Sequence, residues 1–380
     1  MTEAMSTHAQ SLTVLHLVAN RWWTGSADPV LRLLEGLRQR GHRPLLGVIP
    51  GDRLEAKARE AGFDPLPGLS LTPHVTPLAF VRDVTRLRRL VRAEGVHIVH
   101  AHHSHDHWVA MLVRARPESA RRLAVVRTFH NLRSVRSGRL QDGLYRRTAA
   151  VFAVSRQIET RCREIGIPGA RVVWTPGMTD LPRFVADIDP TPIRDEFKLG
   201  GAPVVVSVSR LAANRGHELL LNAFRLLLTT IPEARLLLVG KGEAQLRLEQ
   251  LVAEQGLGDR VIFTGYRDRD LPKILAAADC FALMAAGSDD SCRAVLEAMA
   301  AARPVVARRV GALPETVAHG ETGLLVDEDR PEAVAAALAA VLGDRQRARA
   351  MGHAGRERAS TEFSADRSVA IVERTYRSLA

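Results

Sequence analysis

Residues 203–242 read PVVVSVSRLAANRGHELLLNAFRLLLTTIPEARLLLVGKG. The apolar runs Val204–Val208 and Arg235–Val239 show no polar alternation, which is typical of parallel strands buried on both faces. Between them, His217–Leu228 carries leucines at helical spacing. A strand, a helix and a second strand in this order predict a βαβ unit, because parallel strands need such a crossover connection.

The same alternation extends outward from this unit in both directions. Further strands are expected at Leu12–Val18, Pro44–Ile49, Val96–His100, Leu123–Val126, Val151–Ser155, Val172–Thr175, Val261–Thr264, Cys280–Met284 and Pro304–Ala307. Further helices are expected at Val30–Arg40, Leu54–Ala61, Leu78–Glu94, Glu243–Gln255, Leu271–Ala278, Ser291–Ala301 and Phe363–Leu379.

This pattern predicts an α/β protein with two Rossmann-like, doubly wound domains, residues 1–190 and 191–362. Thr191–Pro203, with Asp, Pro and Gly around it, is the expected linker between them. Ligands of open α/β sheets bind beyond the carboxyl ends of the strands. We therefore expect chemistry in the loops after the strands, in a central cleft between two facing sheets.

The composition is that of an ordinary globular protein, with 46% hydrophobic and 25% charged residues in a chain of 380. No apolar run reaches the roughly 20 residues needed to span a bilayer. Met1–Ser11 is polar and lacks the features of a secretory signal, so we expect a cytoplasmic protein. Cys162, Cys280 and Cys292 are far apart in sequence, so neither a disulfide framework nor a cysteine zinc site is expected.

Positive charge is confined to the first half of the chain. Lys and Arg exceed Asp and Glu by the full net charge of +11 within residues 1–190, and the charges of the remainder cancel. The excess indicates either an anionic partner, such as lipid headgroups, a phosphorylated acceptor or nucleic acid, or an arginine-rich composition without one. We find no basic-aromatic recognition motif and therefore expect no nucleic-acid partner.

The predicted helix Leu78–Glu94 is amphipathic and basic. Val81, Val84, Leu87 and Val91 share one face, and arginines lie on or near the other. Such a helix can lie on an anionic membrane surface, here the inner face of the cell membrane, or it can be an ordinary covering helix with a solvated side.

Cationic and glycine residues follow the first two strands of the second half. Arg210 and Arg215 flank a turn at a helix start and are either a clamp for a diphosphate or two solvated arginines. Lys241 stands between Gly240 and Gly242, glycines that would let the backbone approach a ligand.

An acidic pair follows the strand Cys280–Met284. Asp289 and Glu297 are eight residues apart, or roughly 12 Å along a helix axis, and amides of Ser291–Arg293 would lie free at the helix start. The alternative is an N-capping Asp289 with a solvent-facing Glu297. On physical grounds Val310–Glu315 and His319–Val326 are predicted to be loops.

Histidines follow the strand Val96–His100, in the order His100-Ala-His102-His103-Ser-His105-Asp106-His107. The metallohydrolase pattern His-x-His-x-Asp-His is not complete here, because counting from His102 places Asp106 and His107 correctly but puts Ser104 where the second His is needed. No metal site is therefore predicted.

Two other segments of the first half follow strands. Gly25, in Trp22-Trp23-Thr24-Gly25, would let backbone amides approach a diphosphate and an acceptor, and the tryptophans are core anchors or an acceptor platform. His130 follows the strand Leu123–Val126 and is expected to face the cleft.

The order and spacing of these segments resemble the retaining family 4 glycosyltransferases (glycosyl transferases group 1), which have the GT-B fold. That family carries Gly-Arg-Leu…Lys-Gly, matched here by Ser209–Leu211 and Arg215-Gly216, and Glu-x7-Glu followed by Ala-Met-Ala, matched by Asp289-x7-Glu297. Its Gly-Gly-x-Pro-Glu and Gly-x-Thr-Gly-Leu-Leu-Val motifs are similar to Gly311–Glu315 and Gly320–Val326.

The resemblance implies a role for each matched residue. Arg210 and Arg215 would bind the donor diphosphate, Glu297 the ribose hydroxyls, Asp289 the transferred sugar, and His102 the same sugar near the reacting carbon. The expected catalytic residues are therefore His102, Arg210, Arg215 and Asp289, and the expected substrate-binding residues are Gly25, His130, Lys241, Ser291, Cys292, Arg293 and Glu297.

The resemblance also implies the reaction. A sugar moves from a nucleoside diphosphate, UDP or GDP, to the hydroxyl of a glycan or lipid-linked acceptor with retention, without a required metal or other cofactor. Polysaccharide, lipopolysaccharide and glycolipid synthesis of the cell envelope are the expected settings. The C-terminal helix, within residues 363–380, would pack back on the first domain.

Two departures from the family pattern leave alternatives open. Asp289 replaces the usual Glu, which shortens the reach to the sugar, and Arg215 replaces the usual Lys. The alternatives are a nucleotide-sugar-binding paralogue with weak or no transferase activity and a GT-B nucleotide-sugar epimerase.

Overall fold

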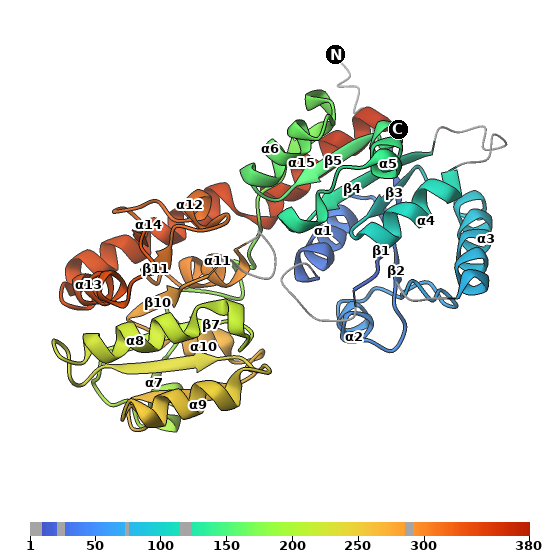
Figure 1. The fold of residues 1–380 in the computed structure, drawn as a ribbon. Coiled ribbons are helices and arrows are strands. Elements are labelled where there is room, and N and C mark those ends of the chain that lie inside the picture. Colours follow the sequence, from blue (N-terminus) through green and yellow to red (C-terminus); the bar gives the residue numbers. More distant parts are fainter. Residues whose placement is uncertain (1–9, 21–26, 73–75, 115–122, 286–291) are drawn as a thin grey trace, which may run out of the picture. The chain divides into compact units, whose positions relative to one another are not determined.

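The structure, a computed structural model, describes residues 10–20, 27–72, 76–114, 123–285 and 292–380. The chain divides into two compact units (Figure 1): unit 1 is residues 1–175 with 368–380, and unit 2 is residues 176–367. Each unit is built on a six-stranded sheet whose neighbouring strands pair in parallel. The expected α/β class with two Rossmann-like units is confirmed.

Unit 1 has the strand order β2-β1-β3-β4-β5-β6. Its strands are β1 (Thr13–Val18), β2 (Arg43–Val48), β3 (Ile98–Ala101), β4 (Ala124–Phe129), β5 (Ala150–Ala153) and β6 (Val172–Trp174). Its helices are α1 (Asp28–Gln39), α2 (Arg53–Glu60), α3 (Pro77–Ala93), α4 (Ser104–Arg114), α5 (Arg139–Arg147), α6 (Arg156–Glu164) and α15 (Ala365–Leu379), with 3-10 turns η1 (Leu132–Ser134) and η2 (Gly169–Arg171). One core beside the sheet includes residues of α1 and α15, and another includes residues of α3 and α4.

Unit 2 has the strand order β12-β11-β10-β7-β8-β9. Its strands are β7 (Val204–Val208), β8 (Arg235–Val239), β9 (Val261–Gly265), β10 (Cys280–Leu283), β11 (Val305–Arg308) and β12 (Gly323–Val326). Its helices are α7 (Thr191–Glu196), α8 (His217–Leu227), α9 (Gln245–Glu254), α10 (Leu271–Ala276), α11 (Arg293–Ala300), α12 (Leu313–Thr316), α13 (Pro331–Leu342) and α14 (Arg345–Glu362), with the 3-10 turn η3 (Ala213–Arg215). The cores on the two faces of this sheet explain why its strands do not alternate in polarity. Val205 packs with residues of α8, α9 and α13, whereas its neighbour Val206 packs with residues of α10 and α11. Each such buried side chain contributes roughly 1.5–3 kcal/mol.

The border between the units lies at Thr175/Pro176, earlier than the expected border at residue 190/191. Residues after 176 join unit 2 because Thr179 donates a backbone hydrogen bond to Phe363 (3.2 Å) and Phe184 is fully buried in the unit 2 core. The expected linker Thr191–Pro203 instead begins with α7, whose Ile193 lies in the same core.

The C-terminal helix returns to unit 1 from residue 368 onward. Its Val369, Val372 and Tyr376 are buried beside the sheet with residues of α1. At the contact with α1 there is no room for a side chain, since a Cβ on Gly36 would lie 2.5 Å from Val369 Cγ2.

Two segments predicted to be loops contain regular structure, so that prediction is wrong in part. Residues 313–316 form the one-turn helix α12, and residues 323–326 form the strand β12. A four-residue strand beside glycines has no distinctive sequence pattern. Its pairing with β11, from Val305↔Gly323 to Arg308↔Val326, is decided by the tertiary structure. Among the described residues, no helix combines the length and the apolar character that crossing a membrane requires.

Candidate functional site

The loops after β7 and β8 form one continuous edge of the unit 2 sheet. Ser209 donates its backbone N–H to Val239 (3.1 Å), Leu211 donates to Lys241 (3.2 Å), and Ala244 donates to Leu211 (2.9 Å). Because β7 and β8 are parallel neighbours, both loops leave the sheet at the carboxyl ends of their strands, the edge at which α/β proteins bind ligands.

The glycines of this edge are needed for packing within the protein. A Cβ on Gly240 would lie 2.0 Å from the Ser209 carbonyl oxygen, and a Cβ on Gly242 would lie 2.1 Å from that of Leu211. Both distances are far below van der Waals contact. These glycines therefore admit the backbone of the neighbouring loop, and the approach to a ligand stays a prediction.

The arginines of the predicted clamp both lie in the loop after β7. Arg210 is exposed, and its Nη2 lies 2.9 Å from an oxygen of Glu243, which follows β8. Arg215 ends η3 and is separated from α8 by Gly216, and Lys241 is exposed on the partner loop. Exposed ion pairs contribute little stability, so Arg210 can exchange Glu243 for another anion at low cost.

His217, the first residue of α8, is a residue of this edge that the sequence reasoning missed. It is buried, and its Nε2 lies 3.1 Å from Ser209 Oγ and 3.2 Å from the carbonyl oxygen of Arg210. Burial lowers the pKa of His217. Its hydrogen bonds hold the backbone that carries Arg210. The only sequence signal was its position at the start of a helix.

Of the acidic pair Asp289 and Glu297, the structure describes only Glu297, which lies on α11. Its side chain is buried, with 5% of the residue exposed, so the alternative of a solvent-facing Glu297 is wrong. Oε1 accepts a 2.7 Å hydrogen bond from Arg293 Nε one turn earlier. Cys292 directly precedes the helix in the left-handed conformation (φ 52°) and is buried. Asp289, Ser291 and Gly25 lie outside the described residues.

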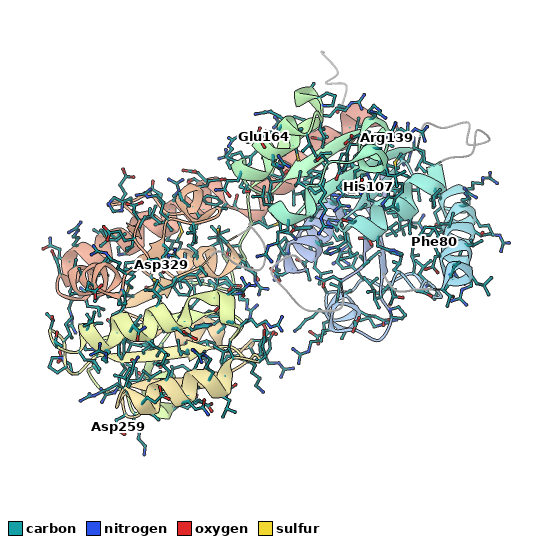
Figure 2. The ribbon with its side chains drawn as sticks, in the orientation of Figure 1. Phe80, His107, Arg139, Glu164, Asp259 and Asp329 are labelled. Atoms are coloured by element: carbon teal, nitrogen blue, oxygen red, sulfur yellow. The ribbon has the colours of Figure 1, made fainter. Side chains whose placement is uncertain are left out.

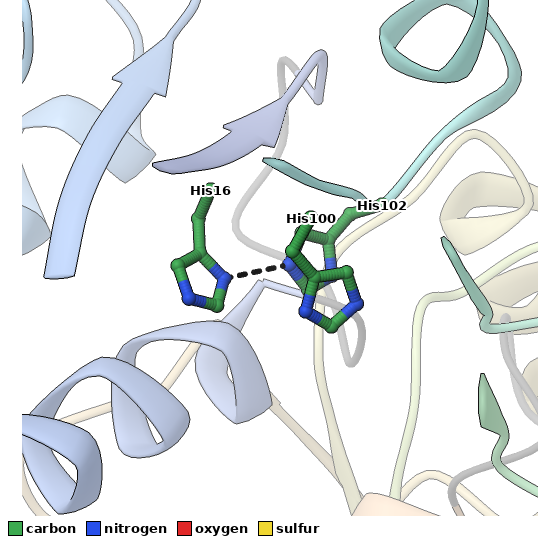
Figure 3. A group of neighbouring side chains, drawn as sticks. All are labelled: His16, His100 and His102. Atoms are coloured by element: carbon green, nitrogen blue, oxygen red, sulfur yellow. Dashed lines mark hydrogen bonds between the residues drawn. The ribbon is translucent and has the colours of Figure 1, made fainter. Parts of the chain in front are cut away.

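In unit 1, three histidines are joined in a hydrogen-bonded chain. His16 Nδ1 lies 3.2 Å from His102 Nε2 (Figure 3), and His102 Nδ1 lies 3.1 Å from His130 Nε2. Burial lowers the pKa of His16 to about 3 and holds those of His102 and His130 well below their usual value. The three rings are therefore neutral near pH 7, and histidine partners occupy both nitrogens of His102.

A second group of contacts surrounds His100, the strand neighbour of His16. Possible ligand atoms of His16, His100 and His102 lie within 4.8 Å of one another. However, the ring nitrogens of His100 bond the hydroxyl of Tyr376 and Thr128 Oγ1 (2.7 Å). A metal at this trio would have to displace these hydrogen bonds and those of His102, so we assign no metal to it.

Asp106, on α4, is a further buried group at the carboxyl end of the unit 1 sheet. Its carboxylate accepts the backbone N–H groups of Ala19 (3.0 Å) and His103 (2.9 Å), and so ties the loop after β1 to the start of α4. Burial raises the pKa of Asp106 to about 7, against the opposite effects of these hydrogen bonds and of Arg127. The sequence reasoning considered this residue only as a metal ligand.

Two family models match the chain over most of its length. Residues 190–358 match the model described as "Glycosyl transferases group 1". Residues 23–183 match the model described as "Glycosyltransferase Family 4".

Two kinds of glycosyltransferase are among the proteins similar to this chain. The D-inositol 3-phosphate glycosyltransferase of Corynebacterium urealyticum is 31% identical over 370 residues, which cover 90% of this chain and 85% of that protein. The GDP-mannose-dependent alpha-(1-6)-phosphatidylinositol monomannoside mannosyltransferase of Mycolicibacterium smegmatis is 37% identical over 214 residues. That match covers 54% of this chain and 56% of the mannosyltransferase, so it spans little more than half of that relative.

Solved structures share the fold over almost the whole chain. A glycosyltransferase from Rickettsia africae has a TM-score of 0.85 at 18% identity, with 97% of this chain and 98% of that chain covered. Anabaena HepE in complex with UDP-glucose has a TM-score of 0.80 at 21% identity, with 97% and 99% covered. With the two parallel sheets, these similarities confirm the GT-B fold.

Proposed function

Because this chain belongs to the family 4 glycosyltransferases, we propose that it moves a hexosyl group from a nucleoside diphosphate sugar to an acceptor hydroxyl. The observation that carries the proposal is the cationic edge of unit 2. There Arg210, Arg215 and Lys241 follow two adjacent parallel strands, at the sheet edge where such folds bind phosphates.

In the proposed mechanism the arginines act on the leaving group. The bond between the anomeric carbon and the diphosphate oxygen breaks, and negative charge grows on the diphosphate. Guanidinium groups stabilise that charge best when they are held in place before reaction, and the hydrogen bond of His217 fixes the backbone that carries Arg210. The acceptor oxygen then bonds the same carbon, and its proton passes to the leaving phosphate oxygen. We propose retention of configuration and no metal requirement.

Glu297 is proposed to accept hydrogen bonds from the ribose hydroxyls. Its buried carboxylate is already oriented by Arg293 on the same helix. Amides at the start of α11, near Cys292 and Arg293, are proposed to hold the sugar, and the roles given above to Asp289, Ser291 and Gly25 remain part of the same proposal.

We propose roles for the histidines of unit 1 as well. His102 is placed beside the transferred sugar only if it gives up one of its two histidine partners, whereas His130 Nδ1 has no hydrogen-bond partner among the described residues. Among these two, His130 is therefore the histidine that can offer a ring nitrogen to a substrate without giving up a histidine partner.

The relatives suggest which substrates to test first. Named relatives use GDP-mannose and act on phosphatidylinositol monomannoside, and another is a D-inositol 3-phosphate glycosyltransferase. HepE was solved with UDP-glucose. We therefore propose a GDP- or UDP-linked hexose as donor and a glycan or lipid-linked acceptor of the cell envelope.

The test is a matrix of donors and acceptors, with nucleotide release and glycosylated product both measured, with and without EDTA. GDP-mannose, UDP-glucose and UDP-N-acetylglucosamine are combined with inositol phosphate, phosphatidylinositol and a lipid extract. The double variant Arg210→Met, Arg215→Met should lose at least about 100-fold in turnover. Arg247→Met, which removes an exposed arginine paired with Glu218 on the same unit, is the matched control and should retain activity.

Each alternative function has its own signature in this assay. Nucleotide binding with no product from any pair would favour the binding paralogue. A changed or freed sugar without any acceptor would favour the epimerase. The anomeric configuration of the product, read by NMR, tests retention.

The proposed membrane contact rests on α3 (Figure 1). Arg82, Arg86, Arg89 and Arg92 are exposed on this helix, as are two large apolar residues, Leu78 (80% exposed) and Val81 (59% exposed). Val81 was expected on the buried face with Val84, and that prediction is wrong. A solvated face that carries both arginines and aliphatic groups suits an anionic lipid surface. Salt-sensitive sedimentation with anionic vesicles is expected, and equal binding to neutral vesicles would remove this proposal.

A further inference from the structure

A buried arginine of unit 1 lacks the partner that such a charge normally requires. Arg127, in β4, is only 2% exposed; its guanidinium lies over the ring of Phe129 (4.6 Å), but it forms no ion pair with a described carboxylate. Its one side-chain hydrogen bond runs from Nη2 to Ser104 Oγ (3.3 Å), and Nε has no partner among the described residues. A buried unpaired charge is costly, so its presence indicates an anion that the protein alone does not provide.

Two imidazole nitrogens without partners among the described residues lie around this arginine. His130 follows β4 and is 5% exposed, and its Nδ1 is unpaired within the described part of the chain. His103 precedes α4, and its buried Nε2 is likewise unpaired there. The centroids of the two rings lie 6.0 Å apart. Burial lowers the pKa of both histidines, and the positive charge of Arg127 lowers it further.

The start of α4 adds backbone donors to the same place. This helix of 11 residues begins at Ser104, the residue that Arg127 contacts. Its first N–H groups carry the partial positive charge of a helix N-terminus, which favours an anion. The Asp106 carboxylate is the opposing charge nearby. It is committed to the N–H groups of Ala19 and His103, and burial raises its pKa to about 7, so it neutralises Arg127 only in part.

We propose that Arg127, His103, Ser104 and His130, with the start of α4, form a phosphate-binding site in unit 1 that holds a phosphate ester of the acceptor. A tetrahedral oxyanion offers acceptors to the guanidinium, to the helix amides and to the two imidazoles, each in the tautomer that carries its proton on the unpaired nitrogen. The assignment of that phosphate to the acceptor rests on the proposed function, in which the donor diphosphate is bound by unit 2. Binding of a phosphate to the site itself does not rest on it.

The test follows the ring Cε1–Hε1 signals of His103 and His130 by NMR in the full-length protein, without any donor sugar. Four probes are titrated: inorganic phosphate, glycerol 3-phosphate, short-chain phosphatidylinositol and GDP. Inorganic phosphate and glycerol 3-phosphate should move both signals with one common Kd. Phosphatidylinositol alone would assign the site to a lipid headgroup. The proposal is overturned if no phosphate moves them, or if only GDP does, which would make the site part of donor binding.

Variants separate this site from general attraction by a basic unit. Arg127→Gln should weaken phosphate binding about tenfold or more, and Ser104→Ala, at an exposed residue that can be changed without disturbing the core, should weaken it by a smaller factor. The matched control is Arg139→Gln, which removes the same charge from the exposed start of α5 (Figure 2) and should leave the Kd unchanged. Equal losses in Arg127→Gln and Arg139→Gln would overturn the proposal. If Arg127→Gln does not fold, the phosphate Kd of Ser104→Ala is compared with that of Arg139→Gln. Weaker binding by Ser104→Ala alone supports the site, and equal Kd values overturn it.

Turnover is read separately from binding. Glycosyl transfer in the donor matrix with no phosphate effect on the histidines would refute this site and leave the proposed function standing. Phosphate binding at the histidines with no glycosyl transfer from any donor would support this site and refute the proposed function.

Discussion

Asp106→Asn is expected to make unit 1 more stable near neutral pH. The carboxyl of Asp106 is fully buried, and its pKa rises from 3.8 to about 7 because burial disfavours the charged form. A folded pKa above the unfolded value means that the protonated group stabilises the fold. That contribution is fully present below about pH 3.8 and is lost as the pH rises through about 7. A shift of roughly three pKa units corresponds to a loss of about 4 kcal/mol.

Asparagine keeps an acceptor oxygen for the N–H groups of Ala19 and His103 but cannot ionise. The difference in unfolding free energy, variant minus wild type, should therefore grow by about 2 kcal/mol between roughly pH 5.5 and pH 7.5 and then stay level to about pH 8.5. Any constant offset from the new amide does not change this slope. Asp64→Asn, at a fully solvated side chain of the same unit, is the control and should give a flat difference.

The chain is suited to this measurement because all its tryptophans, Trp22, Trp23, Trp108 and Trp174, belong to unit 1. Urea denaturation followed by tryptophan fluorescence therefore reports on unit 1, even if the two units unfold separately. A difference that stays constant with pH, or that falls as the pH rises, would refute the conclusion that burial controls the ionisation of Asp106.

Three further outcomes are expected. Burial lowers the pKa of His16 to about 3, so the stability that its neutral ring contributes is complete above about pH 6.5 and falls by about 2 kcal/mol by about pH 5. His16→Phe should therefore reduce the acid sensitivity of the free energy of unfolding measured in the tryptophan-detected urea curves. An unchanged acid sensitivity would contradict this prediction. Gly242→Ala should destabilise unit 2 by about 1–3 kcal/mol in calorimetry and weaken GDP binding, because its Cβ would lie 2.1 Å from a carbonyl oxygen. Gly258→Ala, whose Cβ would have no atom within 4 Å, is the control and should change neither stability nor GDP binding. Equal behaviour of the two variants would show that the loop around Gly242 relaxes. Glu243→Gln should tighten GDP binding by a few fold in calorimetric titration, since it releases Arg210 from the ion pair and removes a negative charge from the sheet edge. Weaker GDP binding would mean that the ion pair positions Arg210 for the nucleotide.

Sequence reasoning identified the strands of the site more reliably than the contacts between them. A strand such as β7 is a run of apolar residues with covering helices on both sides, so local sequence carries its signal. The order of Arg210, Arg215, Lys241 and Glu297 after these strands also followed from the sequence. The reason for Gly240 and Gly242 did not, because it lies in a loop about 30 residues away.

By itself, the sequence determined two parallel α/β units, the family pattern of the second unit and the concentration of positive charge before residue 190. Only the tertiary structure decided that His16 joins His102 and His130, that Asp106 is buried, and that Arg127 pairs with no carboxylate of the described residues. Periodicity and spacing show which residues close together in sequence can be buried on one face of a helix or strand. Hydrogen bonding and ionisation depend instead on groups brought together from strands far apart in sequence.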